Sequence, residues 1–107
     1  MAADCPIGTL VSGAPAGQGP LAGFANYVLR PHTFSSRMVC YLEDLWVEPS
    51  SRSAGRGRRF IEALVARGRD QGWRRIYWHT EADNPARRLY DRAARLTDYV
   101  RYDISLP

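Results

Sequence analysis

A pair of carboxylates and a glycine- and arginine-rich turn follow one another closely in the sequence. Glu43 and Asp44 interrupt an otherwise apolar run, and the stretch from Arg52 to Gly57 reads R-x-x-G-x-G at the start of a helical pattern. Glycines leave the backbone N–H groups of such a helix start open to a ligand. The helix dipole and the arginines both favour an anion there, so we expect the turn to bind a pyrophosphate.

The predicted anion site extends over the turn and the first residues of the helix. Its members are Arg52, Ser53, Ala54, Gly55, Arg56, Gly57 and Arg58. Every basic residue of the chain is an arginine, whose planar guanidinium can bind phosphate through two parallel hydrogen bonds. The absence of lysine excludes Schiff-base chemistry and a lysine nucleophile.

The net charge of +4 also fits a nucleic-acid partner. The arginine run is, however, too short and too often interrupted by glycine for a recognition helix. The aromatic residues also do not alternate with it as they do in an RNA-binding platform. Nucleic acid is therefore the least favoured partner.

The elements around the turn are expected to be a strand, a helix and a second strand. The run from Tyr41 to Val47 is rich in aromatic and apolar residues and ends before Pro49, as a strand does. Strict alternation places Tyr41, Glu43, Leu45 and Val47 on one face and Leu42, Asp44 and Trp46 on the other. A helix with an apolar stripe then runs from Gly57 to Gly72, and Arg74 to Thr80 forms a strand parallel to the first.

Further segments complete the predicted sheet and add a second helix. Leu21 to Arg30 pairs with Arg37 to Val47 as an antiparallel hairpin. The second helix follows a polar turn in which Asn84 or Asp83 acts as the cap. Asp98 to Leu106 alternates apolar and polar side chains, which predicts a terminal strand with one apolar face.

Two motifs that occur in a fixed order make the sequence pattern specific enough to compare with a known family. The E-D pair, V-x-P and R-x-x-G-x-G precede Asn84, Ala86, Leu89 and Tyr90, which have the pattern N-x-A-x-x-L-Y. Together they resemble the GNAT superfamily of acetyl-CoA-dependent N-acetyltransferases, and LEDLWV resembles its diamine and amino-acid acetyltransferase branch. The resemblance implies an α/β (α+β) fold with a mixed, mostly antiparallel central sheet and a parallel β-α-β cofactor-binding unit.

The resemblance implies an enzyme that transfers an acetyl group from acetyl-CoA to a primary amine of a small molecule, such as a polyamine or an amino acid. Glu43 corresponds to the family's general base, and burial among its apolar neighbours would raise its pKa toward the working pH. Tyr90 corresponds to the general acid for the coenzyme A thiolate. Whether Glu43 or Asp44 faces the site is left open.

The resemblance also implies which residues outside the turn bind acetyl-CoA. They are Leu45, Trp46, Val47, Asn84, Arg87 and Tyr90. The backbone N–H of Val47 is the expected donor to the thioester carbonyl. Asn84 is the expected hydrogen-bond partner of the pantetheine arm.

Residues 1–20 depart from the family pattern. They are rich in glycine and proline, which predicts a flexible segment with at most a short strand from Ile7 to Val11. The family usually has two helices here that wall the acceptor site, and residues 21–107 would form a single domain without them. The main alternative function is therefore a degenerate member that binds acetyl-CoA or a partner without turnover.

Composition narrows the remaining possibilities. The sequence contains neither an apolar run long enough to span a membrane nor a pattern typical of a signal peptide, so we expect a cytoplasmic protein. Cys5 and Cys40 have no metal-binding spacing, which predicts free thiols and no metal. A chain of 107 residues builds only a small core, and an uncovered strand edge favours a homodimer.

Overall fold

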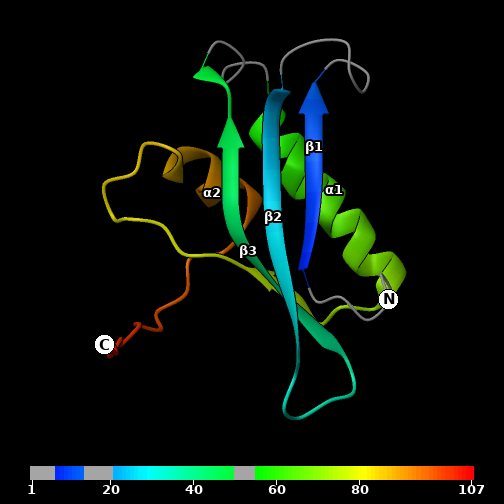
Figure 1. Cartoon of the computed structure of the whole chain (residues 1–107), viewed down its shortest axis with the longest axis vertical. Coiled ribbons are helices and arrows are strands. Elements are labelled where there is room, and N and C mark those ends of the chain that lie inside the picture. Colours follow the sequence, from blue (N-terminus) through cyan, green and yellow to red (C-terminus); the bar gives the residue numbers. More distant parts are fainter. Residues whose placement is uncertain (1–6, 14–20, 50–54) are drawn as a thin grey trace.

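The computed structural model has a four-stranded sheet with a long helix across one face (Figure 1). The structure describes residues 7–13, 21–49 and 55–107. The elements are β1 (Ile7–Gly13), β2 (Leu21–Pro31), β3 (Met38–Val47), α1 (Arg56–Gln71), β4 (Arg75–Tyr77) and α2 (Arg87–Ala93). The strands lie in the sheet in chain order, and among the described residues no helix precedes β2.

The first three strands form an antiparallel meander. β2 pairs with β3 on one side and with β1 on the other, which confirms the predicted hairpin. The short strand predicted from Ile7 to Val11 is β1, and it continues to Gly13. The sheet therefore includes part of residues 1–20, a stretch for which the composition predicted flexibility.

A β-bulge at Glu43 breaks the alternation of β3. Leu42 lies opposite Tyr27 and Asp44 lies opposite Asn26, so Glu43 is the extra residue between two ordinary pairs. Strict alternation therefore assigned the wrong faces to the residues that follow the bulge.

The bulge returns the end of β3 to the core. The β3 side chains that pack in or against the buried cluster include Leu42, Leu45 and Val47. Asp44 and Trp46 lie on the opposite face, where they contact Asn26 and Phe24. An apolar end of β3 thus packs on the α1 side, while a carboxylate faces away from it.

α1 covers the sheet with the apolar stripe that its sequence predicts. Its buried residues are Phe60, Ile61, Leu64 and Gly68. The helix ends at Gly72, which adopts the left-handed conformation with φ of 75° and donates its N–H to the Gly68 carbonyl. Trp73 then packs against the helix end and is only 7% exposed.

The core is a single small cluster between α1 and the middle strands. Its buried members are Ala25, Tyr27, Cys40, Leu42, Phe60, Leu64 and Trp73. Burial raises the pKa of the Cys40 thiol to about 12, so this cysteine stays protonated and takes part in packing rather than in chemistry. Cys5 lies outside the described residues.

β4 is shorter than the sequence predicts. The strand covers Arg75–Tyr77 rather than Arg74 to Thr80, and it pairs in parallel with the first part of β3, from Val39 to Tyr41. β3 continues beyond Tyr41 with β2 alone as its partner. The predicted parallel strand–helix–strand unit is therefore confirmed, and its two strands part after Tyr77.

A turn and a short helix follow β4. The N-cap of α2 is Ala86, and no side chain caps the helix. The predicted cap, Asn84, instead accepts a hydrogen bond from the Ala86 N–H at 2.9 Å. Asn84 therefore stabilises the turn that leads into α2.

The terminal strand predicted from Asp98 to Leu106 is absent. Residues 94–107 form an extended tail after α2, which ends away from the sheet (Figure 1). The tail does alternate apolar and polar side chains, but a strand is stable only when a neighbouring strand pairs with its backbone. The described part of the chain is otherwise the α+β fold that was predicted, with three antiparallel strands and one parallel unit.

Candidate active site

The start of α1 is open in the way that an anion site requires. Gly55 precedes the helix with φ of 79°, a conformation that glycine adopts without strain. Among the residues that the structure describes, no side chain forms a cap hydrogen bond with the first turn, and that turn carries no acidic residue. The backbone N–H groups and the positive end of the helix dipole therefore have no anionic partner in this part of the chain.

Arg56 adds positive charge at this helix start. Its Nη1 donates to the Ser12 hydroxyl of β1 at 2.6 Å, which holds the guanidinium near the end of that strand. Its Nε is buried without a hydrogen-bond partner among the described residues. A buried, unpaired cationic donor fits a site for a phosphate-bearing ligand.

Gly57 brings α2 close to the first turn of α1. A Cβ built at Gly57 would lie 3.0 Å from Leu89 Cδ2 on α2, so a side chain there would crowd the contact. Leu89 directly precedes Tyr90 in the sequence. The R-x-x-G-x-G and N-x-A-x-x-L-Y motifs therefore meet in space, one at the start of α1 and the other on α2.

Tyr90 lies in a cleft between β4, α2 and the tail. The cleft has a volume of about 680 Å³, and both Tyr90 and Arg87 line it. The Tyr90 ring meets Trp78 edge to face, with 5.3 Å between ring centroids. Burial raises the pKa of the Tyr90 phenol above its usual value, so the phenol keeps its proton at neutral pH and can donate it.

The other two predicted residues near α2 already have partners within the chain. The Asn84 amide donates from Nδ2 to the Thr80 hydroxyl at 2.6 Å, besides accepting from Ala86. Arg87 Nη1 donates to the Ala82 carbonyl at 2.7 Å. Both side chains hold the loop before α2, and their contacts with acetyl-CoA stay predictions.

The end of β3 contributes the remaining residues of the predicted cofactor site. Leu45 and Val47 pack against the core, and Val47 pairs with Gly23 of β2. Trp46 lies on the opposite face, where it stacks on Phe24 with 5.8 Å between ring centroids. The assignment of the Val47 N–H to the thioester carbonyl stays a prediction. Arg52, Ser53 and Ala54 lie outside the described residues.

The two carboxylates of β3 occupy different environments. Glu43 sits on the bulge and is exposed, so the burial expected for it among Leu45, Tyr41 and Trp46 is wrong for the single chain. Asp44 accepts a hydrogen bond from Asn26 Nδ2 at 3.3 Å, and Asn26 Oδ1 accepts one from the Thr9 hydroxyl at 2.8 Å. Asp44 thus ends a row of hydrogen-bonded polar side chains across three strands. The carboxylate of Glu43 is exposed and lies outside this row.

One polar group on the sheet was not found from the sequence. The row from Thr9 to Asp44 depends on the register of three strands, which no local pattern specifies. His79 follows β4 and lines the cleft, and its Nδ1 lies 3.5 Å from the Tyr41 hydroxyl of β3.

The described part of the chain has two further negative features. No helix in it is long and apolar enough to cross a membrane. It also holds no cluster of three or more potential metal ligands.

Comparison with known proteins identifies the motifs. Residues 3–94 match the model of the acetyltransferase (GNAT) family. A D-amino-acid N-acetyltransferase of Saccharomyces cerevisiae is 35% identical over 85 residues, which cover 78% of this chain and 53% of that protein. The chain thus spans about half the length of this curated relative.

Solved acetyltransferase structures share the fold at low sequence identity. An aminoglycoside acetyltransferase from an uncultured soil metagenomic sample superposes with a TM-score of 0.84 at 16% identity, covering 95% of this chain and 67% of that one. A ribosomal-protein-alanine N-acetyltransferase from Brucella melitensis biovar Abortus 2308 gives 0.80 at 19% identity, with coverage of 94% and 72%.

Proposed function

The chain belongs to the acetyltransferase (GNAT) family, and we propose that it transfers the acetyl group of acetyl-CoA to a primary amine of a small molecule, with an amino acid or a polyamine as the acceptor. The observation that carries the proposal is the meeting of its two motifs. The open start of α1 lies against α2 through Gly57 and Leu89, and the next residue of α2 is Tyr90.

This arrangement supports a division of roles. A pyrophosphate bound at Gly55 to Arg58 would leave the thioester end of acetyl-CoA near the point where β3 and β4 part. Arg56, with its buried and unpaired Nε, supplies charge to the phosphate end. Tyr90 lies in the neighbouring cleft with its phenol protonated.

The proposed reaction needs two proton transfers. Acetyl-CoA supplies the thioester. Glu43 accepts a proton from the amine as the nitrogen forms a bond with the carbonyl carbon. Tyr90 donates its proton to the sulfur as the carbon–sulfur bond breaks. The products are an N-acetylated amine and coenzyme A with a free thiol.

One observation favours a second candidate, a protein that binds acetyl-CoA without turnover. Glu43 is exposed, and no helix precedes β2 among the described residues, so this part of the chain provides no helical wall for an acceptor site beside Glu43. An uncovered base lacks the water-poor surroundings that strengthen proton transfer.

The two candidates are separated by measuring binding and turnover on the same protein. Calorimetry with acetyl-CoA reports the shared binding site, and mass spectrometry of acetyl-CoA incubated with D-amino acids, L-amino acids and polyamines reports N-acetylated products. We expect both binding and at least one acetylated amine. Binding without any product supports the second candidate, and the absence of binding overturns both.

For the base, we expect Glu43→Gln to reduce kcat/KM and to shift the acid limb of its pH profile, because the amide cannot accept the amine proton. Asp44→Asn is the matched control: it lies on the same strand, loses the same charge and should leave that limb in place. The measurement is kcat/KM against pH for all three proteins. A limb that moves only in Asp44→Asn reassigns the base to Asp44, and a limb unmoved in both points to water.

A further inference from the structure

The cleft beside Tyr90 is strongly basic. Its lining includes five arginines and one acid, namely Arg30, Arg75, Arg87, Arg95, Arg101 and Asp91. Among the described residues, Arg101 is the one member of this set that forms an ion pair, and its partner is Asp103. Guanidinium groups without an acidic partner attract an anion and repel a cation. The charge of the cleft therefore favours an acceptor that carries a carboxylate over one that carries only ammonium groups.

Arg30 is held in this cleft by an aromatic ring. Its Nε donates to the Tyr77 hydroxyl at 3.2 Å, and its Cζ lies 5.5 Å from the centre of the Tyr77 ring. Neither terminal nitrogen, Nη1 or Nη2, has a hydrogen-bond partner among the described residues. These two nitrogens form an edge of the guanidinium that can bind a carboxylate through two parallel hydrogen bonds.

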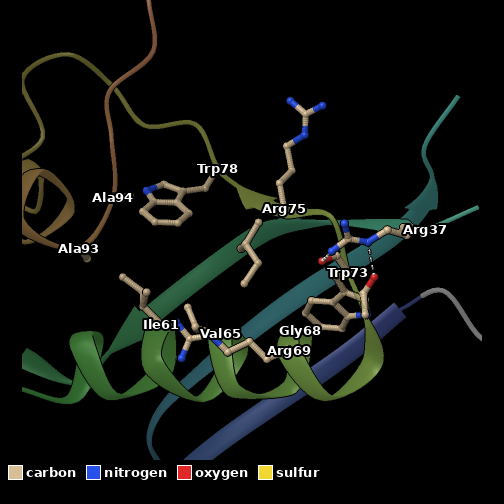
Figure 2. A pocket seen from close by; sticks show the side chains of 12 residues that line it. Arg37, Ile61, Val65, Gly68, Arg69, Trp73, Arg75, Trp78, Ala93 and Ala94 are labelled. Carbon is tan, nitrogen blue, oxygen red and sulfur yellow. Dashed lines mark hydrogen bonds between the residues drawn. The ribbon is translucent and has the colours of Figure 1, made fainter. Parts of the chain in front are cut away.

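The stem of Arg30 lies along the face of the sheet opposite α1. Arg30 of β2 and Arg75 of β4 are the cross-strand neighbours of Val39 on β3. Val39 is on the face away from α1, because Met38 and Cys40 on either side of it pack with the core. Figure 2 shows the Arg75 side chain extending from β4 away from α1. Val39 is nevertheless fully buried, and the aliphatic stems of the two flanking arginines account for its burial.

The ring that holds Arg30 lies where β3 and β4 part. Tyr77 pairs with Tyr41 at the last paired position of the two strands, and their ring centroids are 5.1 Å apart. Glu43 follows Tyr41 by two residues, which corresponds to about 7 Å along a strand. A guanidinium group and the proposed base therefore border the same end of β4.

We propose that Arg30 binds the carboxylate of the acceptor, and that the acceptor is therefore an amino acid rather than a polyamine. Glu43 faces the amino group, and the terminal nitrogens of Arg30 bind the carboxylate. A polyamine would instead place a second ammonium group beside the guanidinium, where the two cations repel each other. Tyr77 supports Arg30 and does not contact the acceptor. The inference rests on the proposed function, because it names the acceptor of that reaction.

The contact should appear in KM rather than in kcat. The carboxylate keeps its charge while the amine is acetylated, so Arg30 contributes equally to the bound acceptor and to the transition state. A hydrogen-bonded pair of charged groups changes affinity by about 10- to 100-fold.

The first test compares acceptors that differ in the carboxylate alone. Phenethylamine is phenylalanine without its carboxylate, and spermidine represents the polyamines. We expect kcat/KM to be higher for D- or L-phenylalanine than for either amine. Arg30→Gln should raise KM for phenylalanine by about 10- to 100-fold and leave phenethylamine nearly unchanged. A purely structural role of Arg30 would change phenylalanine and phenethylamine alike and would contradict the proposal.

Arg75→Gln is the matched control. Arg75 also flanks Val39 and lines the same cleft, so this substitution removes the same charge and shortens a similar stem. Its Nη2, however, donates to His32 Nε2 at 3.3 Å instead of lying on Tyr77. The preference for phenylalanine should persist in Arg75→Gln. An equal loss of preference in both variants would mean that the general charge of the cleft, and not Arg30, selects the acceptor.

A binding measurement separates this inference from the proposed function. Coenzyme A has no acetyl group to transfer, so calorimetry on the protein saturated with coenzyme A measures the affinity for phenylalanine and for phenethylamine without turnover. Tighter binding of phenylalanine that Arg30→Gln abolishes supports the role of Arg30, and if no amine is acetylated, the proposed function alone is wrong. Acetylation of phenethylamine or spermidine as efficiently as phenylalanine, or no preference in binding, overturns the role of Arg30 and leaves acetyl transfer standing.

Discussion

Gly57→Asp is expected to abolish the binding of acetyl-CoA. The new carboxylate would stand in the first turn of α1, where it repels the pyrophosphate that the open N–H groups attract. The side chain would also push against Leu89, since even a Cβ lies 3.0 Å from Leu89 Cδ2. Gly57→Ala separates the two effects, because it adds the crowding without the charge. Calorimetry should show a measurable but weaker affinity for alanine and none for aspartate.

Gly55→Asp is expected to have the same outcome, and α1 contains its own control. Gly55 and Gly72 flank the helix with φ of 79° and 75°, and a Cβ at either would meet no described atom within 4 Å. Both substitutions to aspartate therefore impose a similar backbone strain, while only Gly55→Asp places the charge at the anion site. Thermal unfolding should show similar destabilisation in the two proteins. If Gly55→Asp, still folded, binds acetyl-CoA as tightly as Gly72→Asp does, the assignment of the turn is wrong.

Tyr90→Phe is expected to lower kcat by about 10²- to 10⁴-fold, the range typical of general acid catalysis, while the affinity for acetyl-CoA stays nearly the same. The phenylalanine ring keeps the edge-to-face contact with Trp78 and removes only the hydroxyl. A tyrosine phenol is protonated at neutral pH, and burial raises the pKa of Tyr90 further, so the proton donor that the substitution removes is present in the original protein. Steady-state kinetics and calorimetry together test this separation.

The control for Tyr90→Phe is a second tyrosine of the same cleft. Tyr77 also lines it, and its hydroxyl accepts a hydrogen bond from Arg30 Nε at 3.2 Å. Tyr77→Phe should change kcat by less than about threefold, since that hydroxyl has a structural partner. A loss below about threefold for Tyr90→Phe at every pH would remove it as the acid.

The local motifs predicted the hairpin and the strand–helix–strand unit well. The hairpin, the end of α1 at Gly72 and the parallel return to β4 all follow from rules that act within a few residues or through one crossover. The closeness of Gly57 and Leu89 was not predicted, because their contact joins two helices that local rules treat separately.

The second half of β3 and the tail were predicted less well, for two physical reasons. The bulge at Glu43 is a property of how β3 pairs with β2, and a single strand read alone shows only alternation. The apolar spacing of Leu42 and Leu45 was the available signal, since they are three residues apart and both contact the core. The prediction of a strand in the tail was wrong because the alternating pattern describes only the side chains, whereas a strand also needs a neighbouring backbone to pair with.

The short pairing of β3 with β4 also has a consequence for the order in which the strands of one chain pair during folding. β2 and β3 share nine paired positions across a short turn, whereas β3 and β4 share three and must close a loop that contains all of α1. Closing a longer loop costs more entropy, so we expect β2 and β3 to pair before β3 and β4 do during folding. The β3–β4 pairing is also the less stable of the two, because it has fewer paired positions. The proposed ligand, acetyl-CoA, would lie where β3 and β4 part. Its binding would therefore stabilise the folded chain at the strand pair that has the fewest hydrogen bonds of its own.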